Sequence, residues 1–176
     1  MSGPEYSMSQ ERGAIRDGIT TGLIGAAVVA LFFLGVDLIR GVPGLTPSVL
    51  GQVFVLREPS AVTTQVDVTA ALLFTVVHVL VFVFYGLTLA AFTRRGETSS
   101  IARYAIVALV VAYVPFFLGV LAVADETTRG LFPAWSVLAA NLIAGAAMVY
   151  YLWTRRPAFR DAWRSVPLGA QADVVN

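Results

Sequence analysis

The chain lacks two residue types on which much protein chemistry depends. Its 176 residues include no cysteine and no lysine, because all twelve basic residues are arginine. The absence of cysteine excludes disulfides, thiolate metal sites and cysteine nucleophiles. The absence of lysine excludes Schiff-base chemistry and the lysine of a phosphate-binding loop. We interpret the arginine-only usage as the mark of a GC-rich bacterial genome.

Charge is also scarce. Charged residues make up 13% of the chain and hydrophobic residues 57%, whereas a soluble domain has about 25% charged residues. The formal net charge is only +1, so the composition indicates neither nucleic acid nor an acidic substrate as a partner. It predicts instead a protein whose partner is the lipid bilayer.

Long apolar runs are what the sequence does contain. Four of them are close to the ~20 residues that an α-helix needs to cross a membrane. They cover residues 18–39, 68–92, 102–123 and 131–153. We therefore predict an all-α membrane protein, a four-transmembrane-helix bundle. In this scheme residues 1–17 are a loose or short interfacial cytoplasmic start, residues 18–154 the transmembrane domain and residues 155–176 a cytoplasmic tail.

The arginines near the ends of these runs predict the orientation. If the N-terminus is cytoplasmic, nine arginines face the cytoplasm, and only Arg40, Arg57 and Arg129 face the other side. Such an excess is typical of cytoplasmic loops. We predict a multi-pass protein of the bacterial cytoplasmic (inner) membrane, with the N-terminus and the C-terminus both in the cytoplasm.

The loop after the first span contains a pattern typical of a helix start. In LTPSVLGQVFV, Thr46 can cap a helix whose first residue is Pro47. One face would then carry Val49, Leu50, Val53 and Phe54. We expect a short interfacial helix in this outer loop, with an irregular loop as the alternative. Just before the loop, Asp37 is placed to pair with Arg40 three residues on.

Small residues recur every four positions on two of the spans. This spacing places them on one face of a helix, where they allow two backbones to approach closely. The first stripe comprises Gly18, Gly22, Ala26 and Ala30, and the second comprises Ser136, Ala140 and Ala144. We predict tight helix packing at both stripes, either within the chain or against a second copy.

The only histidine lies in the middle of the second span, at His78 in LLFTVVHVLVFVFYG. Counting about 1.5 Å per residue from the span ends places Tyr113 and Asn141 at the same depth. Thr75 and Tyr85 lie on the same flank of the helix as His78. We expect His78 to face inward, toward Asn141 or Tyr113. This mid-membrane polar layer has two interpretations, either hydrogen bonds that lock helix packing or a proton or ligand site.

Motifs of catalysis are absent from the sequence. It contains no zinc-protease helix motif, no carboxylate cluster and no glycine-rich phosphate loop. We predict that the protein is not an enzyme and has no metal or other cofactor. The favoured function is a structural or accessory subunit that packs with itself or with another membrane protein. A small oligomeric transporter or channel with its site at His78, Asn141 and Tyr113 is one alternative, and a lipid or cofactor binder is the second.

One resemblance to known proteins adds to this interpretation. The run RDGITTGLIGAAVVALFFLGVDLIRG, followed by LTPSVLG and FTVVHVLVFVFYG, resembles small four-span bacterial integral membrane proteins that have no assigned activity. The resemblance covers most of residues 15–90. It implies a small multi-span membrane protein, and it carries no functional residue over to this chain.

Overall fold

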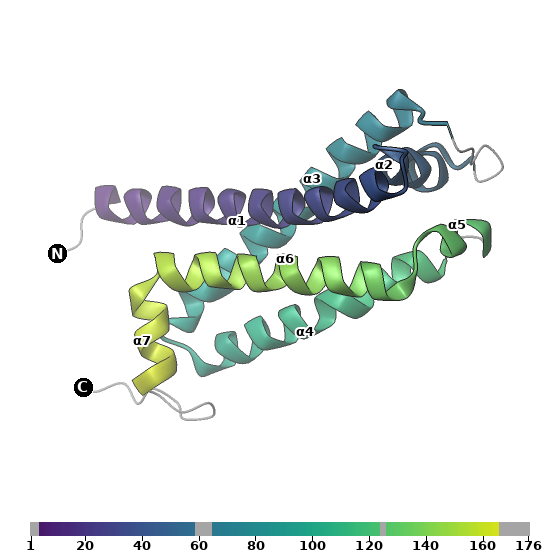
Figure 1. Cartoon of the computed structure of the whole chain (residues 1–176). Coiled ribbons are helices and arrows are strands. Elements are labelled where there is room, and N and C mark those ends of the chain that lie inside the picture. The colour runs from purple at the N-terminus through teal and green to yellow at the C-terminus, as the bar shows by residue number, and fades with distance from the viewer. Residues whose placement is uncertain (1–3, 59–64, 124–125, 166–176) are drawn as a thin grey trace.

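Every regular element of the structure is a helix in the part of the chain that it describes (Figure 1). The structure is a computed structural model that describes residues 4–58, 65–123 and 126–165. Four helices are long and apolar enough to cross a membrane, namely α1 (Pro4–Ile39), α3 (Val68–Gly96), α4 (Ser100–Ala122) and α6 (Ala134–Arg155). The predicted all-α fold with four membrane-spanning helices is confirmed, and the chain is a multi-pass membrane protein by the length and composition of these helices.

Two helices begin at other residues than the predicted spans do. The helix α1 begins at Pro4 rather than near residue 18. Proline is well suited to a first helical position, and the residues between Pro4 and Gly18 include no further proline to interrupt the helix. The fourth span begins at Ala134 rather than at 131 because Pro133, with ψ 135°, stands just before the helix. It separates α6 from the short helix α5 (Glu126–Leu131).

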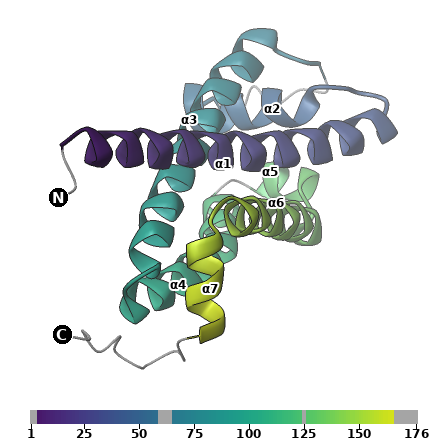
Figure 2. The ribbon, with the colours of Figure 1, turned by 90° about the vertical axis from the view of Figure 1, so that its left-hand side faces the viewer.

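The most extensive contact between two helices is the crossing of α1 and α3, which run obliquely to each other (Figures 1 and 2). A Cβ atom added to Gly22 would lie 2.5 Å from the Cα of Val83, and one added to Gly18 would lie 2.8 Å from the Cα of Leu87. On the other helix, a Cβ atom at Gly86 would meet the backbone of both Gly18 and Gly22. Only glycine permits this distance between the two backbones.

The two alanines of the first stripe differ in burial. Ala26 is buried in a cluster with Phe82 of α3, whereas Ala30 is exposed. The second stripe is buried throughout, since Ser136, Ala140 and Ala144 are at most 2% exposed. Ala140 belongs to the same cluster as Phe33 of α1. Residues of both stripes therefore pack within the chain, with Ala30 as the exception.

The predicted short helix in the loop after the first span is present. It consists of α2 (Leu45–Leu50), which continues into the π-helical turn η1 (Gly51–Leu56). It packs on the start of α3, where a Cβ atom at Gly51 would meet the backbone of Ala70. The backbone N–H of Asp67 also donates a hydrogen bond to Ser48 Oγ, at 2.8 Å. This segment is thus attached to the bundle by side-chain and backbone contacts.

The predicted cap and ion pair in this loop were wrong. Gly44, with φ 86°, occupies the N-cap position, and Thr46 lies inside the first turn of α2. The Asp37 carboxylate of α1 accepts hydrogen bonds from the backbone N–H of Thr46, at 2.8 Å, and from its hydroxyl, at 2.7 Å. Asp37 is fully buried while Arg40 is exposed, so the carboxylate stabilises the unpaired N–H groups at the start of α2 instead of pairing with Arg40.

The last described helix, α7 (Pro157–Ser165), turns sharply away from the end of α6 (Figure 2). Its Phe159 is 4% exposed and packs edge-on against Trp153. The Arg103 guanidinium of α4 donates a hydrogen bond to the backbone oxygen of Ala162, at 2.7 Å. α7 is therefore attached to the same end of the bundle at which α3 ends and α4 begins.

Candidate functional site

A cavity of about 370 Å³ lies among the long helices. Its walls come from all four membrane-spanning helices, from α2 and η1, and from Phe132. The lining is largely apolar, and its polar members are Asp37, Thr46, Thr75, His78 and Asn141. An apolar cavity of about 150 Å³ holds a benzene molecule, so this one has room for a considerably larger apolar group.

The cavity follows from the direction of α3. This helix contacts α1 closely at the glycine crossing, and toward its own N-terminus it diverges from α4 and α6 (Figure 1). α2 and η1 fill part of the resulting space with Leu50 and Phe54. Four large apolar side chains of the cavity wall are 41–59% exposed, namely Leu34, Val77, Val81 and Phe116. In a bilayer these side chains would contact lipid, so the cavity borders on the acyl chains.

His78 lies in the wall of this cavity. Its Nε2 is 3.2 Å from the backbone oxygen of Ala26, and because a carbonyl oxygen can only accept, Nε2 donates this hydrogen bond. The ring centroid is 5.7 Å from that of Phe74 and 4.6 Å from that of Phe82. We expected His78 to face Asn141 or Tyr113, and the hydrogen bond that the structure shows joins it to α1 instead. The small side chain of Ala26 lets α1 approach α3, which brings the backbone oxygen of α1 within reach of the imidazole.

Asn141 lies in the wall of the same cavity and is 3% exposed. Its Nδ2 donates a hydrogen bond to the backbone oxygen of Val137, at 2.7 Å. The acceptor is a carbonyl, so this bond also fixes which end of the amide is nitrogen. The Oδ1 atom is buried, and within the described ranges it has no hydrogen-bond partner. Such a buried acceptor is unusual in a folded protein and calls for an explanation.

The remaining polar residues of the predicted layer separate into two places. Thr75 lines the cavity, and its hydroxyl donates to the backbone oxygen of Ala71, at 2.7 Å. Tyr85 and Tyr113 are not among the lining residues. Their rings pack against each other with centroids 4.8 Å apart, and the Tyr85 hydroxyl donates to the backbone oxygen of Leu109, at 3.0 Å. The structure thus brings His78, Asn141 and Thr75 to one cavity and leaves both tyrosines in the packed core.

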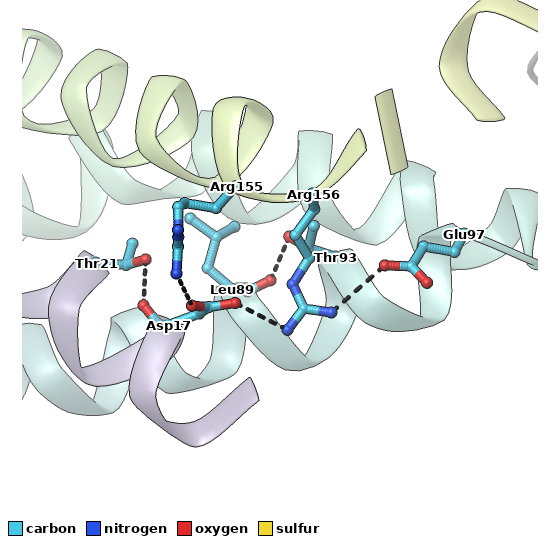
Figure 3. Close-up of polar contacts among 7 residues, drawn as sticks. All are labelled: Asp17, Thr21, Leu89, Thr93, Glu97, Arg155 and Arg156. Carbon is cyan, nitrogen blue, oxygen red and sulfur yellow. Dashed lines mark hydrogen bonds and ion pairs between the residues drawn. The ribbon is translucent and has the colours of Figure 1, made fainter. Parts of the chain in front are cut away.

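Sequence reasoning missed a second polar cluster, at the end of the bundle where α3 and α6 finish (Figure 3). The Arg156 guanidinium lies 3.1 Å from the Asp17 carboxylate of α1 and 3.4 Å from the Glu97 carboxylate that follows α3. Arg155 lies farther from Asp17, at 3.9 Å. The Asp17 and Arg156 side chains are only 11% and 14% exposed. The available signal was that Asp17 and Glu97 are acidic residues at an end otherwise rich in arginine.

The two clusters differ in what they offer. The ion-pair cluster links α1, α3 and α6, and its charges pair with one another. The cavity has free volume, with five polar residues in its lining. In the described part of the chain, no group of three or more His, Asp or Glu side chains is arranged to hold a metal ion. No family model, no curated protein and no solved structure matches the chain.

Proposed function

We propose that this protein is a non-enzymatic membrane protein that binds an apolar, lipid-like molecule in the cavity among α1, α3, α4 and α6. The observation that carries the proposal is the cavity itself, about 370 Å³ in volume, largely apolar, and bordered by exposed apolar side chains. Ligand pockets have volumes of about 300–1,000 Å³ with mostly apolar walls and a few polar groups. An acyl chain can enter such a site from the bilayer without crossing water.

Binding fits the lining better than conduction does. A channel needs a passage with polar or charged groups that replace the hydration of its substrate. Here the polar lining groups are few, and their donors are bonded to the chain itself, as for His78 and Thr75. A structural or accessory role, with a second copy or another membrane protein as partner, stays a prediction and is compatible with ligand binding.

Filling the cavity is expected to abolish binding. Ala30 lines the cavity, so the substitution Ala30→Phe places an aromatic ring inside it. Ala27 lies on the same helix, is exposed and is not a lining residue, which makes Ala27→Phe the matched control. The measurement is equilibrium binding of radiolabelled hexadecyl methyl ether and hexadecan-1-ol to the protein in nanodiscs, corrected for empty nanodiscs.

The expected result is saturable binding by the natural chain and by Ala27→Phe, with a loss of at least tenfold in affinity for Ala30→Phe. If neither probe binds the natural chain above the empty nanodiscs, the proposed function is wrong. Equal binding by the two phenylalanine variants would also contradict it, because the probe would then occupy a different part of the surface.

We further propose that the arginine-rich end of the bundle is cytoplasmic and that the membrane is the bacterial inner membrane. The start of α1 and the end of α6 lie at the same end of the molecule, since Asp17 and Arg156 form an ion pair there. Nine of the twelve arginines belong to this end by their position in the chain. An excess of arginine in short loops and flanks is typical of the cytoplasmic side, and the arginine-only composition supports a bacterial source.

The absence of cysteine allows a clean test of this orientation. Glu126 and Ser165 are exposed residues at opposite ends of the bundle. In intact cells, a membrane-impermeant maleimide is expected to label the Glu126→Cys variant and to label Ser165→Cys only after the membrane is permeabilised. The unsubstituted chain serves as a blank because it has no thiol. The opposite pattern of labelling would reverse the proposed orientation.

A further inference from the structure

We propose that the ligand of the cavity is an uncharged lipid with a free hydroxyl group, and that Asn141 accepts a hydrogen bond from that hydroxyl. The proposal deepens the lipid-binding function stated above and depends on it. It concerns the chemistry of the ligand's polar end, whereas the cavity volume concerns only its apolar part.

The polar side chains of the cavity have mostly used their donors within the chain. The imidazole of His78 donates to the Ala26 oxygen, and the hydroxyl of Thr75 donates to the Ala71 oxygen. Three further donors are also bonded within the chain. The hydroxyl and the backbone N–H of Thr46 both donate to the Asp37 carboxylate, and Asn141 Nδ2 donates to the Val137 oxygen. Among these polar side chains, the second amide hydrogen of Asn141 is the one donor left over.

What the cavity wall offers a ligand is therefore mainly acceptors. Asn141 Oδ1 is buried and without a hydrogen-bond partner among the described residues, and leaving such an acceptor unpaired is costly in an apolar setting. In His78, a neutral ring that donates from Nε2 keeps a lone pair on Nδ1. A ligand group that donates a hydrogen bond fits both atoms.

Charge excludes the common anionic lipids from this part of the cavity. The Asp37 carboxylate also belongs to the lining, roughly 16 Å along α1 from Ala26, so it would repel a fatty acid carboxylate or a phosphate at that end of the cavity. A charged group at mid-bilayer depth carries a large desolvation cost as well. A quinone offers only acceptors, and the wall has little to donate to it. The ligand must therefore be uncharged and must carry a hydrogen-bond donor. A long-chain or isoprenoid alcohol, or a diacylglycerol, meets both conditions.

The test compares two probes that differ only at the polar end. Hexadecan-1-ol has the hydroxyl donor, and hexadecyl methyl ether has the same chain and oxygen but no donor. The natural chain in nanodiscs is expected to bind the alcohol about tenfold more tightly than the ether, the factor that a single net hydrogen bond supplies. The near-isosteric variant Asn141→Leu is expected to bind both probes equally. Thr88→Val is the matched control. Like Asn141, Thr88 donates a hydrogen bond to a backbone oxygen of its own helix, but it lies outside the cavity.

The outcomes separate the two proposals. Equal affinity of the natural chain for both probes would overturn the hydroxyl assignment and leave lipid binding intact. If neither probe binds the natural chain, the proposed lipid-binding function is wrong. A preference for the alcohol that persists in Asn141→Leu would overturn the role of Asn141. Should Asn141→Leu fail to fold, the comparison of the two probes on the natural chain still decides the ligand class. A preference for the alcohol that is retained in His78→Phe leaves Asn141 Oδ1 as the acceptor of the ligand hydroxyl, whereas loss of the preference in that variant would assign the acceptor to His78 and overturn the role of Asn141.

Discussion

Alanine in place of Gly22 is expected to lower the free energy of unfolding by about 3 kcal/mol, the upper end of the range for overpacking a close contact. The added Cβ atom would lie 2.5 Å from the Cα of Val83 and would also meet the backbone oxygen of Phe82. Backbone atoms cannot move aside as the tip of a side chain can, so α1 and α3 must separate. The measurement is equilibrium unfolding in mixed micelles of a mild detergent and SDS, followed by circular dichroism.

Gly35 provides the matched control on the same helix. A Cβ atom there would have no neighbour within 4 Å, so Gly35→Ala removes glycine from a helix without crowding. Its stability is expected to stay the same or to rise by less than about 1 kcal/mol, through the better helix propensity of alanine. If Gly22→Ala were as stable as Gly35→Ala, α1 and α3 would not cross at the glycines.

Methionine in place of Arg156 is expected to destabilise the protein by about 2–3 kcal/mol. The substitution leaves the Asp17 carboxylate, whose side chain is 11% exposed, without the guanidinium at 3.1 Å. Removing one partner of a fully buried ion pair costs about 3–5 kcal/mol, and we lower this figure because both groups retain some contact with solvent. The same unfolding experiment measures the loss, and the stability is expected to become less sensitive to salt.

Arg155 provides the neighbouring control. Its side chain is 48% exposed and lies 3.9 Å from Asp17, so Arg155→Met is expected to cost less than about 1 kcal/mol. The double variant Asp17→Asn with Arg156→Met is expected to lose less stability than the two single variants added together, because it leaves no unpaired charge on Asp17. Additive losses would show that the two residues do not interact.

The mid-membrane layer shows how far depth counting from the sequence extends. Depth counting placed His78 and Asn141 at one level of the bundle, and in the structure both residues line one cavity. It did not predict their partners, which are the backbone oxygens of Ala26 and Val137. A backbone oxygen has no pattern in a sequence, because every residue carries one, so its availability depends on how closely two helices approach.

The ends of the helices also show which features the sequence predicts and which depend on the tertiary structure. Arginine flanks and apolar length predicted the spans well because these properties add up locally along the chain. The same flanks gave no indication that Arg156 would contact both Asp17 and Glu97. That contact joins residues more than fifty positions apart, and it forms only because α3 and α6 end at the level at which α1 carries Asp17.

By itself, the sequence determined the four membrane helices, the short helix after the first of them, and the small-residue faces on which helices pack. These properties follow from composition and spacing, and lipid allows few other ways to satisfy the backbone. Only the tertiary structure decided that α3 diverges from α4 and α6 to leave a cavity and that Asp37 stabilises the start of α2. It also decided that Asn141 Oδ1 has no hydrogen-bond partner among the described residues. The reason is that these features depend on crossing geometry, which is set by close contacts between residues distant in the chain, such as Gly22 and Gly86.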